Sequence, residues 1–497
     1  MESVPVLIVG AGPTGLTLAC DLARRGVACR VIDKAPHPFI GSRGKGLQPR
    51  TLEVFDDLGV LDAVLDAGAP FPPFRLYAGT AIKWERSLED MLAGGLPVPS
   101  ARVPYPRPWL LPQWRTDSIL NARLVALGGR VDFATELTDL SADAAGVTAT
   151  LREAGSTLTV RAQYLVGADG GNSAVRRQCG FAFAGETYET ERTLIGDVRV
   201  QGLSGVACHI LTSEGDATRR FSLWNLPGSE HYQFVASMAA DAVPALSLES
   251  VQRLLEERSG RDDIRLHDLR WISLYRVNVR MVDRFRSGRV FLAGDAAHVH
   301  SSAGGQGLNT SVQDAYNLGW KLAAVLGGTS PALLDTYEDE RLPVAAHVLG
   351  LSTTLHHRDF RPATAPAPAI HQLDITYRGG PLAVDDRCAP GELQAGDRAP
   401  DAVSSDGTRL FDVFRGPHFT LLAMGCPAPS LGPNVRTLAV DTLDGYDVDA
   451  GHFVLVRPDG YVGAISPSLD TIARYPGLGA QRSSLAPLSG PASESRD

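Results

Sequence analysis

Hydrophobic and polar positions near the start of the chain repeat with two different periods. Residues 6–9 form an unbroken apolar run, VLIV, which is typical of a strand buried on both faces of a parallel sheet. Residues 16–25 place their apolar side chains on one face of a helix, and Gly26 follows as a C-terminal cap. Residues 27–32 return to a strand pattern. The order strand, helix, strand predicts one complete β-α-β unit.

The rest of the chain alternates between strand-rich and helical stretches. Residues 70–112 are rich in Pro and aromatic side chains, so we expect irregular structure there. From Leu308 onward, apolar side chains recur at helical spacing and predict a long helix. The other predicted elements are a helix over 49–59, a strand meander over 131–170, strands and one helix (248–258) within 181–285, a buried strand over 289–294 and three strands after residue 396.

Composition places the chain among ordinary soluble globular proteins. Hydrophobic residues make up 44% and charged residues 21% of its 497 residues. The net charge of -9 argues against a general nucleic-acid binder. No apolar stretch reaches the roughly 18 residues that a membrane span needs, and the first residues lack the basic region of a signal peptide. We therefore expect a cytoplasmic protein with neither nucleic acid nor membrane as a partner.

Cysteine and histidine spacing indicates no metal site. The six cysteines are scattered and form no CxxC pair. His298 and His300 lie two residues apart without further ligands at zinc-site spacing. We expect free thiols in a reducing compartment and no bound metal.

A glycine-rich turn joins the first strand to the first helix. The sequence GAGPTG, residues 10–15, matches GxGxxG in the strand-turn-helix context that a dinucleotide-binding turn requires. Its glycines permit the tight turn, the approach of a pyrophosphate and the packing of helix on sheet. Asp33 ends the next strand, where a carboxylate can bind ribose hydroxyls. The cofactor-binding residues predicted here are Gly10, Gly12, Pro13, Thr14, Gly15, Asp33 and Lys34.

Two later segments indicate which dinucleotide is bound. Residues 165–177 read LVGADGGNSAVRR, and residues 290–323 read VFLAGDAAHVHSSAGGQGLNTSVQDAYNLGWKLA. With the glycine turn, they resemble the single-component flavoprotein aromatic hydroxylases, the family of para-hydroxybenzoate and phenol hydroxylases, and within it the branch that acts on aromatic polyketides. The resemblance covers about the first 345 residues well and the remainder more loosely. It implies FAD as the cofactor and NADPH or NADH as the co-substrate.

The resemblance also implies particular FAD contacts. Asp295 would bind the ribityl chain, and residues 304–309 would follow the pyrimidine edge of the flavin. A helix N-terminus at that edge would stabilise the negative charge of reduced flavin. Arg43 would lie near the flavin or its phosphates, and it is the one residue suggested for catalysis. The other implied contacts are Gly305, Gly307, Leu308 and Asn309 at the flavin, Asp169 at the pyrophosphate, Gln113 from the next β-α segment and Leu137 beside the adenine.

The implied fold is α/β, with a Rossmann-like FAD-binding domain interleaved with a β-sheet substrate domain. GDRAPDAV (396–403) and LVRPDGYVG (455–463) resemble a thioredoxin-like C-terminal α/β domain. Cys426 stands alone there, so no dithiol cycle is expected and the domain is read as structural, with a homodimer left open. The boundaries are 1–75, 113–180 and 286–375 for the FAD-binding domain, 76–112 and 181–285 for the substrate domain, 376–395 for a linker, 396–482 for the thioredoxin-like domain and 483–497 for a disordered tail.

In this family, reduced flavin reacts with O₂ to give a C4a-hydroperoxide, which a phenolic substrate attacks. The polyketide branch implies a polycyclic phenol held between the flavin and the sheet of residues 181–285. Candidate walls of that pocket are Phe221, Trp224, Tyr232 and Phe234, although strand alternation puts Phe221 and Trp224 on opposite faces. His209, His231 and Tyr232 stay open as groups that could deprotonate the phenol.

One departure from the family pattern and several alternatives stay open. Ser301 and Ser302 stand just before the GGQG segment, where the family usually has a proline that shapes the site of oxygen activation. A Baeyer–Villiger or epoxidising monooxygenase, or an antibiotic-inactivating hydroxylase, would use the same scaffold. From a different class, a non-catalytic protein that sequesters an aromatic compound is the remaining alternative.

Overall fold

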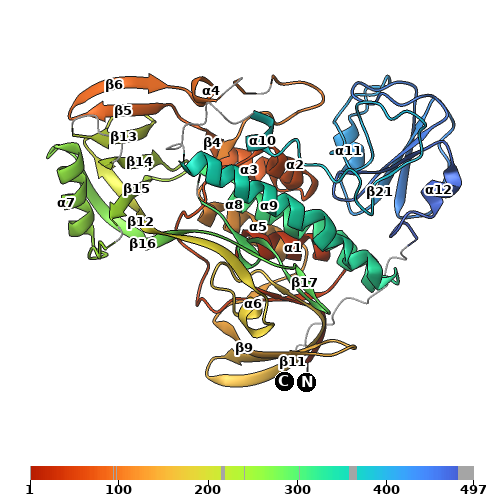
Figure 1. The fold of residues 1–497 in the computed structure, drawn as a ribbon, viewed down its shortest axis with the longest axis horizontal. Helices are drawn as coiled ribbons and strands as arrows, with labels where there is room; N and C mark the ends of the chain where they lie inside the picture. The colour runs from red at the N-terminus through yellow and green to blue at the C-terminus, as the bar shows by residue number, and fades with distance from the viewer. Residues whose placement is uncertain are drawn as a thin grey trace, which may run out of the picture.

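The computed structural model describes residues 2–92, 95–96, 98–213, 219–239, 241–301, 303–357 and 367–479. The tail expected to be disordered, 483–497, and Ser302 therefore lie outside the described residues. The described chain contains two eight-stranded sheets, a five-stranded sheet in its C-terminal part and a small three-stranded sheet, with helices packed around them (Figure 1).

The first large sheet contains the predicted β-α-β unit. Its central strand β1 (Glu2–Val9) runs parallel to β11 (Ser156–Gly167) on one side and to β2 (Cys29–Ile32) on the other. Val6, Leu7 and Ile8 are fully buried, as a strand covered on both faces requires. The outer strands are β18 (Val290–Leu292), β17 (Arg286–Ser287), β8 (Val131–Asp132), β10 (Val147–Glu153) and β9 (Thr135–Ala142).

Helices cover this sheet and confirm the helical predictions. α1 (Pro13–Arg24) packs against both α5 (Gln113–Ala126) and α8 (Gly307–Leu326), and α8 is the long helix predicted from Leu308. α8 in turn contacts α9 (Thr336–His357), which crosses the middle of the molecule in Figure 1. The shorter helices are α2 (Pro49–Asp57), α3 (Leu61–Ala67), α6 (Ala174–Gln178) and α10 (Ala367–His371).

The second large sheet lies beside the first and joins it through its edge strand. The strands follow the order β19 (His298–Val299), β16 (Arg265–Val282), β12 (Phe183–Gln201), β15 (His231–Ala239), β14 (Phe221–Asn225), β13 (Cys208–Thr212), β5 (Phe74–Ala78) and β6 (Ala81–Arg86). α7 (Leu248–Ser259), the helix predicted near 248–258, packs on one face of this sheet. The opposite face therefore points toward the first sheet and its loops.

The expectation of irregular structure over 70–112 is wrong for part of that range. β5 pairs in parallel with β13, and β6 pairs with β5 in the opposite direction. The strand partner lies about 130 residues away in the chain, so local composition carries no signal of it. The same range also contains β4 (Ala69–Pro70), α4 (Leu88–Met91) and β7 (Trp109–Leu110), and β7 joins β4 and β3 (Gly46–Leu47) in the three-stranded sheet.

The C-terminal part of the chain is a separate α/β module beside α9. Its sheet has the order β20 (Val384–Asp385), β24 (Val462–Ser466), β23 (Phe453–Val456), β21 (Phe419–Met424) and β22 (Val435–Val440). β20 falls inside the stretch expected to be a linker, 376–395, yet it pairs with β24. The module also carries the short helices α11 (Leu410–Phe414) and α12 (Leu469–Ala473).

Buried charges join this module to α8 and α9. Arg457, from the turn after β23, bonds Glu340 of α9 (2.5 Å) and Asp459 (2.5 Å). Glu340 also pairs with Lys321 of α8 (2.7 Å). All four side chains are at most 1% exposed. Removal of one member would leave a buried charge without its partner, which makes this cluster a rigid joint.

The described residues contain neither a membrane-spanning helix nor a metal-binding cluster. Among the described helices, none combines the length and apolar character that crossing a bilayer demands. Within the same residues, His, Cys, Asp and Glu side chains form no group arranged to hold a metal ion.

Candidate functional site

The glycine turn between β1 and α1 admits no side chain at two of its positions. Gly10 has a φ of +107°, and a Cβ there would lie 2.3 Å from the carbonyl oxygen of Ala168. A Cβ on Gly15 would lie 1.9 Å from the carbonyl oxygen of Gly10. Asp33 secures the turn from the end of β2, because its Oδ2 accepts a hydrogen bond from the N–H of Ala11 (2.8 Å). The predicted residues of this unit therefore form one compact turn.

The space in front of this turn fits a phosphate group. A Cβ on Gly12 would meet no atom within 4 Å. Gly12 is also the N-cap of α1, Pro13 opens the helix, and no side chain caps it. The first N–H groups of a helix have no partner within the helix and carry the positive end of its dipole. The N–H groups of Gly12, Thr14 and Gly15 thus face this space as donors, as the pyrophosphate of FAD would require, while Pro13 has no N–H. Lys34 is exposed next to Asp33.

Asp169 lies directly behind the glycine turn. Its Cα is 2.9 Å from where a Cβ on Gly10 would stand. Its Oδ2 accepts a hydrogen bond from the N–H of Ala174 (2.6 Å), at the start of α6. Its Oδ1 is buried with no partner among the described residues, so an acceptor stays available at this point. Leu137 is buried in β9, two residues after Thr135, whose N–H donates to the Asp33 carbonyl (2.9 Å).

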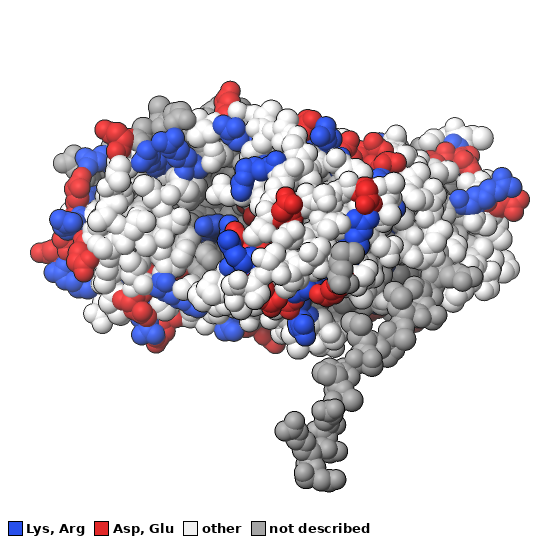
Figure 2. Space-filling view, turned by 90° about the horizontal axis from the view of Figure 1, so that it is seen from below, with Lys and Arg blue, Asp and Glu red and all other residues white. Residues whose placement is uncertain are grey.

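The turn that contains Asp295 packs onto the first turn of α1. Gly294 has a φ of +62°, and a Cβ there would lie 2.5 Å from Oγ1 of Thr14. Asp295 is exposed to solvent, yet desolvation by the surrounding protein raises its pKa above the usual value, with the charge of Arg43 opposing the shift. The Asp295 carboxylate therefore reaches solvent while the protein around it disfavours its charge. Figure 2 shows a hollow near the middle of the face seen from below, with basic side chains beside it.

The GGQGLN segment and the loop of residues 44–48 meet at the start of α8. A Cβ on Gly44 would lie 2.9 Å from Cδ1 of Leu308, and the N–H of Gly44 donates to Oε1 of Gln113 (3.2 Å). Oδ1 of Asn309 accepts a hydrogen bond from the N–H of Gln48 (2.8 Å). The Asn309 side chain therefore holds this loop. No side chain caps α8, so its first N–H groups remain available to a flavin edge.

Two glycines of the GGQGLN segment stand where the chain turns into α8. Gly305 has a φ of +64°, and Gly307 is the first residue of α8. Ser301, at the departure from the family pattern, is buried and its hydroxyl donates to the carbonyl of Ser352 in α9 (3.2 Å). The described half of the Ser-Ser pair is thus integrated into the fold.

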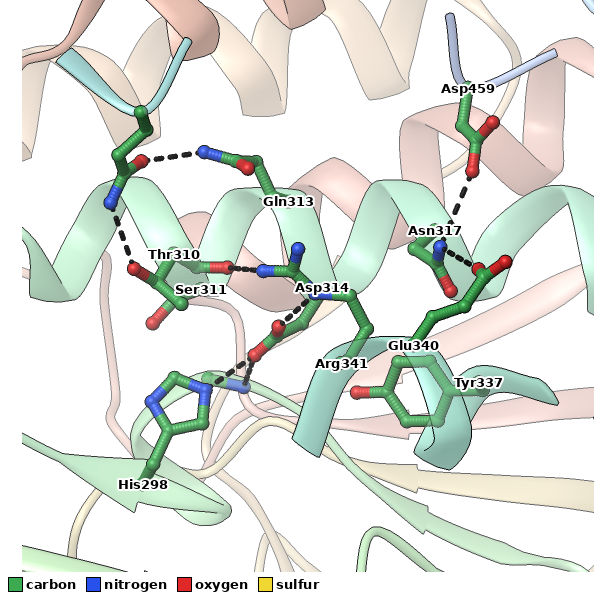
Figure 3. A network of polar contacts seen from close by, with 12 residues as sticks. His298, Thr310, Ser311, Gln313, Asp314, Asn317, Tyr337, Glu340, Arg341 and Asp459 are labelled. Atoms are coloured by element: carbon green, nitrogen blue, oxygen red, sulfur yellow. Dashed lines mark hydrogen bonds and ion pairs between the residues drawn. The ribbon is translucent and has the colours of Figure 1, made fainter. Parts of the chain in front are cut away.

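A buried carboxylate in α8 ties these elements together (Figure 3). Oδ2 of Asp314 accepts hydrogen bonds from Nε2 of His298 (2.6 Å) and from the N–H of Gly294 (3.1 Å). Its Oδ1 accepts from Nε of Arg341 in α9 (2.8 Å). Nδ1 of His298 lies 2.9 Å from Nε2 of His300. Because Nε2 of His298 faces Asp314, its Nδ1 is the atom that faces His300.

Sequence reasoning missed Asp314 and Arg341. In the sequence, Asp314 is one of several polar residues in the first half of α8, among them Thr310, Gln313 and Asn317. Arg341 lies 27 residues farther on. Nothing in the sequence pattern distinguishes Asp314 from its polar neighbours. Both side chains are fully buried, which a lone charged residue would not tolerate.

Arg43 belongs to the loop of residues 42–48, which we call the flavin loop after the contacts predicted for it. Its side chain lies toward the second sheet. Its guanidinium carbon stands 5.3 Å from the ring centre of Phe39 and 5.9 Å from that of Trp271 in β16. The side chain is exposed, and its charge acts on Asp295. Arg43 and Asp295 therefore lie close enough for their charges to interact, and the contact of Arg43 with the flavin stays a prediction.

The candidate pocket walls fall on two different faces of the second sheet. Phe221 and Phe234 are fully buried in the hydrophobic cluster that includes Val251 and Leu255 of α7. They are core residues on the side away from the flavin loop, which corrects their expected place in the pocket. The physical reason is that alternation defines two faces, while only tertiary packing decides which one α7 covers. Tyr232 packs against the same cluster.

Trp224 has the opposite orientation. It pairs across the sheet with Gln233, and its ring centre is 4.3 Å from Nζ of Lys45 in the flavin loop. Rings of Phe71 and Phe74 meet it edge to face, with centres 6.3 Å and 5.3 Å away. Trp224 is therefore the one predicted wall residue on the side of the sheet that faces the cofactor loop.

The three groups considered as a base have different surroundings. His209 is fully buried against Tyr77 (3.0 Å), and desolvation lowers its pKa to about 4. His231 pairs with Asp268 at the end of β15 (3.2 Å). The Tyr232 ring lies next to His209, with centres 6.2 Å apart.

Known proteins are similar to this chain in sequence over most of its length. A family described as FAD binding domain matches residues 3–352. The chain is 63% identical over 471 residues to a flavin-dependent monooxygenase of Mycobacteroides abscessus, covering 95% of this chain and 98% of that protein. It is 34% identical over 504 residues to the 12-dehydrotetracycline 5-monooxygenase/anhydrotetracycline 6-monooxygenase of Streptomyces rimosus, covering 92% and 94%.

A solved structure shares the fold over nearly the full length. The complex of aklavinone-11 hydroxylase with FAD and aklavinone superimposes with a TM-score of 0.79 at 29% identity, covering 96% of this chain and 99% of that one. The similarity thus extends through the C-terminal module.

Proposed function

Because the chain belongs to the family of this FAD binding domain and is an FAD-dependent monooxygenase of aromatic or polyketide substrates, we propose that it uses NADPH or NADH and O₂ to hydroxylate a polycyclic phenol. The observation that carries this proposal is the meeting of three motifs at one cleft. Gly10 packs on Asp169, and Gly294 packs on Thr14. The glycine turn, the Asp169 segment and the Asp295 turn thereby offer donors and acceptors to one extended ligand.

The flavin supplies the redox chemistry, since reduced FAD activates O₂ for transfer of one oxygen atom. The chain binds and orients it. The open N-terminus of α1 would hold the pyrophosphate, Asp33 a ribose hydroxyl and Asp295 the ribityl chain. The open N-terminus of α8 would place its positive dipole end where negative charge accumulates on reduction.

The aromatic substrate would lie between this cleft and the face of the second sheet that carries Trp224. Phe71 and Phe74 stand beside Trp224 and make an apolar wall. Such a wall excludes water and holds a flat ring system in one orientation. The named substrates of the tetracycline and aklavinone enzymes are support for the polycyclic class.

The C-terminal module would be thioredoxin-like and structural. Its mixed five-stranded sheet suits that fold class. Cys426 is its cysteine nearest to the β21 end, and one thiol cannot close an intramolecular disulfide. The buried joint through Arg457 and Glu340 supports a structural role.

Turnover with labelled oxygen tests the proposal. FAD-loaded protein is mixed with NADPH or NADH under ¹⁸O₂, without and with a panel of three- and four-ring phenols. We expect one phenol to accelerate nicotinamide oxidation and to gain one ¹⁸O on a ring carbon, seen by tandem mass spectrometry. A lactone product would indicate Baeyer–Villiger chemistry instead. Equal oxidation with every compound, yielding hydrogen peroxide alone, would contradict hydroxylation of this substrate class.

A further inference from the structure

Lys45 connects the flavin loop to the face of the second sheet that carries Trp224, opposite α7. Gly44 faces α8, where a Cβ would lie 2.9 Å from Leu308. The next residue, Lys45, turns to the sheet: its Nζ lies 2.5 Å from Oε1 of Gln233 and 4.3 Å from the ring centre of Trp224. Lys45 therefore sits at the seam between the cofactor elements and the aromatic wall.

Gln233 holds this arrangement from the sheet. Its side-chain amide is fully buried, and its Nε2 donates to the carbonyl of Ser42 in the same loop. Its Oε1 is the acceptor for Lys45. One glutamine thus aligns both the loop backbone and the ammonium group, which limits where the charge of Lys45 can be.

Among the residues that the structure describes, the ammonium of Lys45 has a neutral hydrogen-bond partner, Gln233, and no carboxylate within 4 Å. The Lys45 side chain is half-buried. Desolvation outweighs Cys208 and Asp197, which favour its charge, so that the pKa of Lys45 falls to about 8. A desolvated cation with one neutral hydrogen bond and one aromatic ring is under-compensated, and an anionic oxygen would compensate it.

The surroundings also limit which anion fits. Trp224, Phe71 and Phe74 form a group of rings next to the ammonium. A flat aromatic system packs against such rings, whereas a small hydrated anion would gain nothing from them. The combination of one cation and several ring faces matches an aromatic compound that carries an ionised hydroxyl group.

We propose that Lys45 is a specificity-determining residue that binds the ionised phenol or enol oxygen of the aromatic substrate, with Trp224 packing against the ring system. This inference rests on the proposed function and deepens it by defining the charge state of the substrate. Gln233 acts as a positioning residue for Lys45.

Equilibrium binding to FAD-loaded protein tests this without turnover. The probes are 1,2-dihydroxyanthraquinone, a three-ring phenol, and its dimethyl ether, each followed by fluorescence quenching at a pH where the phenol is ionised. We expect Lys45→Met, which keeps the side-chain length, to weaken phenolate binding by about 10-fold or more. Binding of the ether should change by less than about 3-fold, since it offers no charge to Lys45.

Lys83→Met is the matched control. Lys83 is an exposed lysine on β6, in the same sheet, and its replacement should leave both dissociation constants unchanged. FAD content and the visible flavin spectrum verify that each variant is folded and loaded.

The outcomes separate the two proposals. Equal losses for phenol and ether in Lys45→Met, or no loss for either, would overturn the role of Lys45 while leaving the hydroxylase proposal intact. A native protein that binds neither probe would overturn this role together with the proposed substrate class. Preferential loss of the phenolate alone supports the assignment.

Discussion

The carboxylate of Asp314 accepts a 2.6 Å hydrogen bond from the imidazole of His298, although one residue lies in α8 and the other in a strand of the second sheet. The same oxygen accepts the N–H of Gly294. One carboxylate therefore sets the spacing between α8, whose N-terminus we propose to face the flavin, and the turn that carries Asp295. This arrangement leads to our first two predictions.

Asp314→Asn should destabilise the protein strongly. Arg341 is fully buried, and it would lose its carboxylate partner. We expect the free energy of unfolding to fall by about 3–5 kcal/mol, as for other buried pairs that lose one partner. Denaturant unfolding of the FAD-loaded protein measures this change, and the FAD content of the purified variant should fall with it.

Asp335→Asn provides the comparison for Asp314→Asn. Asp335 pairs with Arg286 but is 68% exposed, so its loss should cost less than about 1 kcal/mol. Desolvation opposes the charge of Asp314, yet His298 and Arg341 outweigh it and hold the pKa of Asp314 below its usual value. Its contribution is therefore present above its unfolded pKa of about 3.9 and lost as the pH falls below it. Equal losses in the two variants would contradict the anchoring role.

Gly294→Ala should abolish tight FAD binding. The φ of +62° strains any side chain there, and the new Cβ would also collide with Oγ1 of Thr14 at 2.5 Å. Gly288→Ala has nearly the same φ, +58°, and open space around the Cβ. Both variants share a backbone cost of about 1–2 kcal/mol, so their difference isolates the contacts with Thr14 of α1 and Ser311 of α8. The FAD dissociation constant, from flavin fluorescence, should rise by about 10-fold or more only in Gly294→Ala. A similar rise in both would assign the effect to backbone strain alone.

Substitutions of Trp224 and Phe221 should affect different properties: the first ligand binding, the second the free energy of unfolding. Phe221→Ala removes a fully buried ring from the core against α7 and should cost about 3–5 kcal/mol of unfolding free energy. Trp224→Ala should leave most of the stability and weaken the binding of a polycyclic phenol by about 10-fold. Unfolding curves and ligand titration on both variants measure this. The reverse pattern would place the substrate on the α7 side of the sheet.

The charge of Lys45 should give ligand binding a distinct pH dependence. Because desolvation lowers the pKa of Lys45 to about 8, the free protein loses this cation as the pH rises through 8. The neighbouring Asp197 and Cys208 favour the charged form but do not restore the usual value. Binding of anthraquinone-2-sulfonate, which stays ionised throughout, should therefore be constant below pH 8 and weaken above it. The same titration with Lys45→Met should be flat, and a decline there as well would assign the pH dependence to another group.

The cofactor turns could be predicted from the sequence because their conformation is local. Gly10 and Gly15 are required by contacts within one β-α-β unit, and the order of strand, turn and helix shows this directly. Asp314 and Lys45 gain their roles from partners in other elements, and a polar residue in a helix or loop gives no sign of them. Strand alternation separated Phe221 from Trp224, but the position of α7 was needed to tell core from cofactor side.

The joint of Arg457, Glu340, Lys321 and Asp459 means that the C-terminal module is not a detachable appendage. Its charges are complementary only when both parts of the chain are present. Truncation before the module would open Glu340 and Lys321 to water and uncover the apolar surface around Trp320, which packs against Phe419. In chimaeras built from two relatives, the module and α9 therefore have to come from the same parent. The residues at positions 340 and 457 then keep opposite charges.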